Sequence, residues 1–190
     1  MRIVGGERRG LKLAEVGDGD PAAHLRPTPD RVREAVFNLL TNGPAGDRVR
    51  GQRVLDLFAG TGALGLEALS RGAAQAIFVD DGRVAQALIR RNIALMRAEA
   101  AADLLRLDAT RLGPNGGAPF ALVFLDPPYG QSLGERALAS ALEGGWLAPG
   151  ACVVWEEAAD PAPPPGFAVT DRRRYGGTSV TLLQGHGGAG

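Results

Sequence analysis

Four consecutive residues near the middle of the chain, Asp126, Pro127, Pro128 and Tyr129, combine residue types that could hold an amine. A carboxylate accepts a hydrogen bond from an N–H group, and paired prolines fix the backbone so that the Pro127 carbonyl can accept a second one. The tyrosine ring offers a flat face on which a nucleobase can stack. The exocyclic amine of a base is a poor nucleophile, because its lone pair is delocalised into the ring. Two acceptors favour the pyramidal amine and expose the lone pair, so these residues predict transfer of a group to an amine.

A glycine-rich segment, LDLFAGTGALG at residues 55–65, predicts a cofactor site. Gly60, Gly62 and Gly65 form the pattern G-x-G-x-x-G between a predicted strand and a predicted helix, which is typical of dinucleotide-binding turns. On this pattern alone NAD is one interpretation. Asp56 favours S-adenosylmethionine (AdoMet) instead, because that cofactor carries an ammonium group and no phosphate for a carboxylate to repel. The predicted cofactor turn also includes Phe58, Ala59 and Thr61.

Two further acids follow the next two predicted strands. Asp80 comes twenty residues after Gly60, and Asp108 ends the third strand. Because the carboxyl ends of parallel strands lie along one edge of a sheet, these acids should flank the glycine turn. We expect Asp56 near the methionine end of AdoMet, Asp80 on the ribose hydroxyls and Asp108 on the adenine amine. Asp81 is the alternative ribose ligand, but Asp80 directly follows the apolar run, and neighbouring strand residues point to opposite faces.

The elements that must position these residues alternate between strand and helix, which indicates an α/β fold of the Rossmann-like type with a mostly parallel sheet. Helix 132–144 follows the strand that ends in Asp126, and two closing segments, 167–173 and 178–184, flank RYGGT as a hairpin that adds an antiparallel strand. The other strands are predicted at 53–60, 74–80, 103–108, 120–126 and 151–157, with helices at 63–72 and within 82–100.

The sequence predicts one methyltransferase-sized domain over residues 1–184, built from three parts. Residues 1–24 are expected to form a hairpin extension, 25–42 a leading helix, and 52–184 the AdoMet-binding core. Thr28 is the expected N-cap of the leading helix, with Pro29 at its first position. Residues 185–190 are expected to form a disordered tail.

Composition excludes several classes of protein. No apolar run approaches the roughly 20 residues that span a bilayer, and the start lacks the pattern of a secretory signal. A single cysteine, Cys152, excludes a disulfide framework and suits a reducing, cytoplasmic compartment. With only two histidines, far apart in sequence, no metal site is expected.

Charge is informative through its position, because the 21 basic and 21 acidic residues cancel. Basic residues gather near the N-terminus, and Arg172, Arg173 and Arg174 form a second group near the end. Such clusters could contact the phosphates of a nucleic acid, although arginines on solvated surfaces are common and this chain has little lysine. The candidate RNA contacts are Arg2, Arg8, Arg9, Lys12, Arg26, Thr28, Arg31 and Arg33.

The AdoMet motif followed by DPPY resembles the class I methyltransferases that act on exocyclic amines of nucleobases. More closely, the chain is similar to the bacterial 16S ribosomal RNA guanine-N2 methyltransferase family over most of residues 1–184. This resemblance implies a seven-stranded sheet with the last strand antiparallel, and a monomer that methylates guanine N2 in 16S rRNA, within the small ribosomal subunit or its precursor. The matching segments are RIVGGERRGLKL, RPTPDRVREAVFNLL, LDLFAGTGALGLEALSRGA, VFLDPPY and RYGGTSVTLL.

Two departures and two rival functions accompany the resemblance. Arg8 stands where the family often has an aromatic residue, and Asp80-Asp81 stands where an acidic-basic pair is common. The same D-P-P-Y chemistry serves adenine N6, so an adenine-N6 methyltransferase acting on RNA or DNA is one alternative. A non-catalytic AdoMet- or NAD-binding module is the other, although Asp56 and the intact DPPY motif speak against it.

Overall fold

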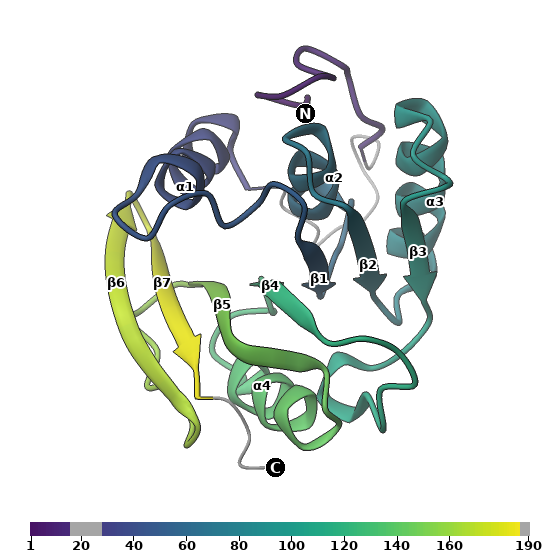
Figure 1. The fold of residues 1–190 in the computed structure, drawn as a ribbon. Helices are drawn as coiled ribbons and strands as arrows, with labels where there is room; N and C mark the ends of the chain where they lie inside the picture. The colour runs from purple at the N-terminus through teal and green to yellow at the C-terminus, as the bar shows by residue number, and fades with distance from the viewer. Residues whose placement is uncertain (16–27, 187–190) are drawn as a thin grey trace.

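The structure is a computed structural model, which describes residues 1–15 and 28–186. A seven-stranded sheet lies between helices on its two faces (Figure 1). The helices are α1 (Asp30–Asn42), α2 (Ala63–Ser70), α3 (Arg83–Met96) and α4 (Leu133–Glu143), with a short 3-10 turn at Ala109–Arg111. The strands are β1 (Arg53–Leu57), β2 (Gln75–Val79), β3 (Ala102–Leu105), β4 (Phe120–Leu125), β5 (Leu147–Glu157), β6 (Phe167–Tyr175) and β7 (Thr178–Gly185).

The strand order is β3-β2-β1-β4-β5-β7-β6. Strands β1 to β5 pair in parallel, while β7 lies antiparallel between β5 and β6. The predicted α/β class, the parallel sheet and the closing hairpin are therefore confirmed. The sheet reverses direction of winding between β1 and β4, and ligands bind at the carboxyl ends of the strands at such a switch point in folds of this kind.

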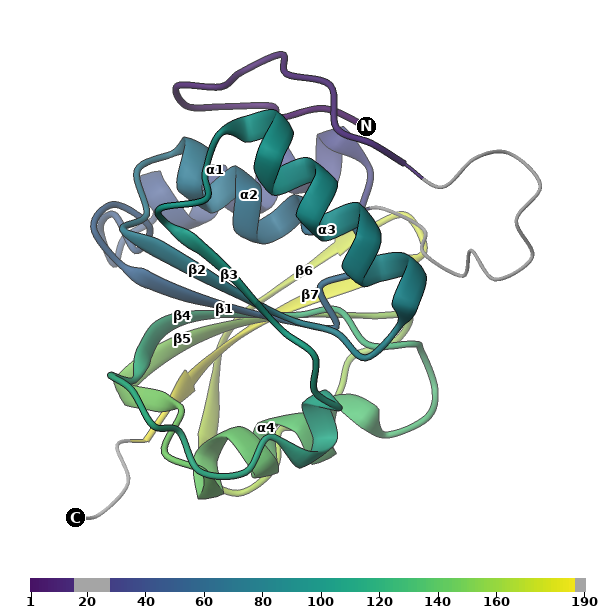
Figure 2. The same ribbon diagram turned by 90° about the vertical axis from the view of Figure 1, so that its right-hand side faces the viewer.

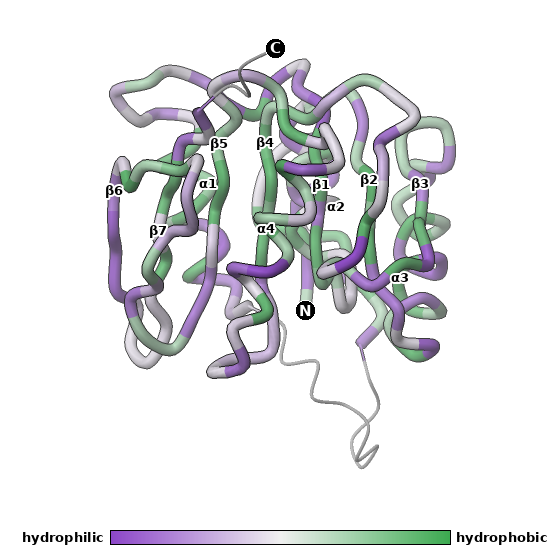
Figure 3. The backbone as a smooth tube through the Cα atoms, turned by 90° about the horizontal axis from the view of Figure 1, so that it is seen from below, coloured by the Kyte–Doolittle hydropathy of each residue, from purple (hydrophilic) through white to green (hydrophobic). Residues whose placement is uncertain are grey.

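Two apolar cores hold the layers together. Helices α1, α2 and α3 cover one face of the sheet and α4 covers the other (Figure 2). Phe37 of α1 packs on Phe124 of β4 in the first core, with ring centroids 5.4 Å apart. Trp155 and Trp146 belong to the second core, beneath α4. Since both faces are covered, the central strands are hydrophobic along nearly their whole length, as the tube in Figure 3 shows.

Some predicted boundaries were wrong for reasons that bear on the site. Strand β1 ends at Leu57 rather than at residue 60, because Phe58 turns into the left-handed region with φ 56°. Strand β3 ends at Leu105, so Asp108 follows the strand by three residues instead of ending it. The disordered tail predicted for residues 185–190 was wrong at its first two residues: Gly185 completes β7, and the His186 N–H donates to the Gly166 carbonyl. The remaining residues of the predicted tail lie outside the described residues.

The N-terminal segment docks on the main domain. One bridge joins Arg2 to Lys12, and the side chains of Ile3 and Leu13 are buried in the first core. The Val4 N–H also donates to the Glu67 carboxylate of α2 at 2.8 Å. The predicted extension therefore packs as part of the same domain, and its predicted portion from residue 16 lies outside the described residues.

The leading helix starts later than predicted. Helix α1 begins at Asp30 with Pro29 in the N-cap position, and no side chain caps it. Thr28 was therefore wrongly predicted as the N-cap; its side chain reaches β5 instead, as described below. None of the helices in the described ranges is both long and apolar enough to cross a membrane.

Candidate active site

The glycine turn after β1 adopts backbone angles that side chains disfavour. Gly60 and Gly62 have φ of 58° and 77°, and Gly62 leads directly into α2. Gly65 serves packing instead: a Cβ there would lie 2.4 Å from Cε1 of Phe78 and 3.1 Å from Oδ2 of Asp56. The first turn of helix α2 can therefore pack closely against strands β1 and β2.

Asp56 lies beneath this turn with only 2% of its surface exposed. Its Oδ2 accepts a hydrogen bond from the Gly65 N–H at 2.9 Å. Burial, with smaller contributions from the charges of Asp80 and Glu156, raises the pKa of Asp56 to about 8, although that hydrogen bond lowers it. This shift favours the protonated form of Asp56, and the contact of Asp56 with the methionine end of AdoMet stays a prediction.

Asp80 holds the glycine turn from the end of β2. Its two carboxylate oxygens accept from the Gly60 N–H and the Gly82 N–H, each at 2.9 Å. Burial raises its pKa, and these two hydrogen bonds oppose the shift. Asp81 is exposed and makes none of these contacts. Of the two acids considered for the ribose, Asp80 is the one that lies against the cofactor turn.

Asp108 lies where one of its two oxygens remains available. Its Oδ1 accepts from the backbone and the hydroxyl of Thr110, at 2.8 and 2.7 Å, and so caps the 3-10 turn. These hydrogen bonds lower its pKa. Oδ2 stands 4.0 Å from the Arg111 guanidinium, and the contact of Asp108 with adenine stays a prediction.

Asp126 follows β4 at the centre of the sheet edge. The register pairs Leu125 with Leu57 of β1 and with Trp155 of β5, so the next residue along each strand brings Asp126 beside Glu156. Burial, then the charges of Glu156, Asp56 and Glu157, raise the pKa of Asp126 well above its usual value. A carboxyl with a raised pKa at the carboxyl edge of a sheet is suited to taking up a proton.

Glu156 is a buried acid that the sequence did not single out. It is 2% exposed, and both of its oxygens accept from the Thr28 hydroxyl, at 3.2 and 3.1 Å. Burial raises the pKa of Glu156 to about 7, although the Thr28 hydrogen bond and the Arg33 charge lower it. Asp126 and Glu156 are therefore two neighbouring carboxyls in a site where ionising both is unfavourable.

The loop that carries Tyr129 is tied to the last three strands. The Thr178 side chain lies close enough to the Tyr129 hydroxyl to lower the pKa of the phenol, and the Gly130 N–H donates to Glu157 at 2.8 Å. The ring is 43% exposed, as a stacking platform must be. Burial, followed by the charge of Asp126, raises the pKa of the phenol to about 12, so it stays protonated.

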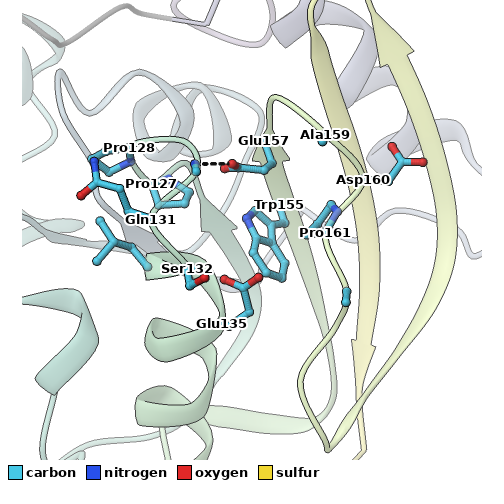
Figure 4. Close-up of a pocket in the computed structure, with 14 residues that line it drawn as sticks. Pro127, Pro128, Gln131, Ser132, Glu135, Trp155, Glu157, Ala159, Asp160 and Pro161 are labelled. Atoms are coloured by element: carbon cyan, nitrogen blue, oxygen red, sulfur yellow. Dashed lines mark hydrogen bonds between the residues drawn. The ribbon is translucent and has the colours of Figure 1, made fainter.

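A cavity of about 270 Å³ lies behind this loop, on the side of α4. Pro127 and Pro128 form one wall, Trp155 the floor, and Glu157 and Pro161 the opposite wall (Figure 4). Asp126, the residue before this proline pair, is not among the residues that line the cavity. The loop is supported from beneath by packed residues of β5 and the 158–162 segment.

The candidate RNA contacts fall into two groups. Arg33 was wrongly predicted to contact RNA: its guanidinium is fully buried and bonds Asp30 at 2.7 Å and the Thr28 carbonyl at 3.2 Å. Thr28 is also buried, and Arg26 lies outside the described residues. The candidates with exposed side chains are Arg2, Arg8, Arg9, Lys12 and Arg31.

Asn92 is a second residue that sequence reasoning missed. It is fully buried on α3, where its side-chain amide donates to the carbonyls of Thr61 and Ala14 and accepts from the Ala14 N–H at 2.7 Å. Asn92 therefore joins the N-terminal segment to the glycine turn. No cluster of metal-ligating side chains occurs in residues 1–15 and 28–186.

This sheet, with its antiparallel β7 beside β5 and its glycine turn after β1, is the fold of the class I methyltransferases. The solved structure of yhhF from Escherichia coli superposes with a TM-score of 0.81 at 34% identity, covering 98% of each chain. Ribosomal RNA small subunit methyltransferase D of Escherichia coli is 38% identical over 188 residues, which are 97% of this chain and 89% of that protein. The protein of the same name from Haemophilus influenzae is 34% identical over 84% of this chain and 80% of its own length.

A family described as "Conserved hypothetical protein 95" matches residues 1–184. The chain belongs to this family, together with the small subunit methyltransferase D proteins, and the predicted family resemblance is confirmed.

Proposed function

We propose that this protein transfers a methyl group from AdoMet to the exocyclic N2 amine of a guanine in 16S rRNA of the small ribosomal subunit. The observation that carries the proposal is the strand end at Asp126, where one acid, one fixed carbonyl and one exposed aromatic ring follow each other. The names of the relatives, which are small subunit ribosomal RNA methyltransferases, support the substrate. The matches to these relatives cover nearly the whole chain, including the strand end at Asp126, which supports assigning the active site to this position.

The residues around the glycine turn fit AdoMet. Gly60 and Gly62 have positive φ angles and carry no side chain that could hinder a ligand at the turn. Asp80 stands beside the turn with a half-buried carboxylate. Phe58, Ala59 and Thr61 would line the cofactor, and Asp108 has one free oxygen for the adenine amine. When bound, AdoMet supplies an electrophilic methyl group on a sulfonium.

The amine is activated by position rather than by a strong base. The Asp126 carboxylate accepts one amine N–H and the Pro127 carbonyl accepts the other, while Tyr129 stacks on the base. The two acceptors orient the nitrogen lone pair toward the methyl group. After transfer the amine nitrogen is acidic, and Asp126 can take its proton because burial and neighbouring acids raise the pKa of this carboxyl.

The substrate is tested by incubation with tritiated AdoMet and small ribosomal subunits, naked rRNA or DNA, followed by nucleoside analysis. Label in N2-methylguanosine from the subunit or its rRNA is expected. Label in N6-methyladenosine would instead assign the enzyme to adenine, and binding of NADH without S-adenosylhomocysteine binding would exclude the methyltransferase.

Asp126 is tested by the substitution Asp126→Ala. We expect AdoMet affinity, measured by titration calorimetry, to be retained and turnover to fall by about 10² or more, because an acceptor of the reacting amine is lost. Loss of AdoMet binding would contradict this role.

Asp80 is tested against its neighbour. Asp80→Asn should weaken AdoMet binding about tenfold or more, since one charge-assisted acceptor is removed, whereas Asp81→Asn should leave it unchanged. Equal effects of the two substitutions would contradict the assignment of the ribose to Asp80.

A further inference from the structure

The edge strand β6 carries a basic face that the site described above does not use. Arg172, Arg173 and Arg174 are all exposed on this strand. Arg173 pairs with Asp171 at 3.0 Å. Arg172 and Arg174 have no ion-pair partner among the residues that the structure describes, and they hydrogen-bond to backbone carbonyls instead. We call these two side chains the β6 arginine face.

Both side chains are held in place by the segment that follows β5. Arg172 donates to the Pro161 carbonyl at 2.9 Å, and Arg174 donates to the Ala158 carbonyl at 3.3 Å. A guanidinium has five N–H donors, so several donors of each remain for a ligand. Because each group is already oriented, it loses less conformational entropy on binding an anion than a free side chain would.

The β6 arginine face is connected to the loop that holds the proposed target base. Ser179 pairs with Arg174 across the hairpin and with Glu157 across β5. Thr178, the next residue along the chain toward the turn, lies beside the Tyr129 hydroxyl, and Glu157 accepts a hydrogen bond from the Gly130 N–H. The basic face therefore begins within a few residues of the stacking ring and extends away from it along the edge of the sheet.

We propose that Arg172 and Arg174 bind consecutive phosphates of the RNA strand that flanks the target nucleotide. This inference rests on the proposed function, because it takes the base on Tyr129 to belong to RNA. The two residues are two positions apart on a strand, which separates them by about 7 Å and suits neighbouring phosphates. The rim of the cavity behind the loop carries Glu135, Glu157 and Asp160, which would repel a phosphate, so the strand passes along the outer edge.

Charge removal at this face is compared with charge removal at the opposite edge of the sheet. The test variant is Arg172→Gln with Arg174→Gln, which removes both charges and keeps a polar amide at each position. The control is Arg90→Gln with Arg97→Gln. Arg90 lies on α3 and Arg97 directly follows it; both are exposed, and they too have no ion-pair partner among the described residues. Binding of a 16S rRNA fragment is measured at several salt concentrations, with AdoMet affinity followed by calorimetry.

Binding of RNA is described by the slope of log K against log salt concentration, where K is the association constant. We expect this slope to become shallower by about 1.4 to 1.8 in the test variant, because two phosphate contacts are lost. KM for RNA should rise with kcat nearly unchanged, and AdoMet affinity should not change. The Arg172→Lys, Arg174→Lys variant, which keeps both charges, should retain most of the slope. A role confined to holding the 158–161 segment predicts a change in affinity without a change in slope.

Three outcomes overturn the inference. An unchanged salt slope in the Gln variant, or an equal change in the α3 control, would show that these arginines do not bind phosphate. Unchanged binding of naked RNA, with weakened binding of the assembled subunit, would assign the face to an acidic protein surface. If the wild-type protein methylates RNA, each of these results refutes the arginine face alone; wild-type failure to bind or methylate any RNA refutes the proposed function as well.

Discussion

Replacing Asp56 with asparagine should stabilise the protein at neutral pH. The folded protein raises the pKa of Asp56 from 3.8 to about 8, mainly by burial. Below pH 3.8 the carboxyl is protonated in both states and there is no cost. As the pH rises toward 8, the unfolded chain releases the proton while the folded protein retains it, so the free energy of unfolding falls by about 1.4 kcal/mol for each pH unit. At pH 7 this amounts to about 4 kcal/mol.

Asparagine removes this penalty while keeping the local contact. Its side-chain oxygen can still accept the Gly65 N–H, and it is neutral at every pH. The advantage of Asp56→Asn over wild type should therefore grow by about 3 kcal/mol between pH 5 and pH 7. The measurement is urea unfolding of both proteins at each pH, without AdoMet.

The control is Asp81→Asn, because Asp81 is exposed. Its effect on the free energy of unfolding should change little with pH. A pH-independent difference for Asp56→Asn would refute the reasoning, because it would mean that Asp56 is ionised in the folded protein. Loss of stability at pH 7 would refute it too, by showing that the ionised carboxylate is needed at Gly65.

Two further substitutions test the site and its support. Glu156→Gln removes a negative charge that raises the pKa of Asp126, so the acidic limb of the pH–rate profile should move to lower pH. If steady-state assays show no shift of this limb, the two carboxyls are not coupled. Gly65→Ala should destabilise the protein by about 1–3 kcal/mol in urea unfolding, because the new Cβ would lie 2.4 Å from Phe78. The control Gly116→Ala should change stability little, because a Cβ at Gly116 would meet open space. Similar effects of the two substitutions would contradict the packing role of Gly65.

Local sequence patterns predicted the elements that fill the sheet. The segments around Leu55 and Val123 are apolar because both faces of their strands are covered, and an acid after such a run is readily located. The same logic placed Asp126 and Asp80 at the carboxyl edge. The precise ends were harder to predict, because Phe58 leaves β1 through a positive φ that its residue type does not signal.

Pairings between distant residues could not be predicted. Nothing in VVWEE distinguishes the buried Glu156 from its neighbour, and its partner Thr28 is 128 residues away. Arg33 did carry a signal: it precedes Val36, Phe37 and Leu40 by three, four and seven positions, so it lies on the buried stripe of α1. A charged residue on such a stripe is expected to be paired within the protein.

The position of β7 between β5 and β6 has a consequence for when this protein becomes active. Thr178, which lies beside the Tyr129 hydroxyl, belongs to the last strand to be synthesised, whereas Thr28, which donates to Glu156, precedes the whole sheet. A nascent chain that has completed the cofactor turn still lacks the hairpin that fixes the base platform. Under the proposed function, we expect methyl transfer only after nearly the entire polypeptide has been synthesised.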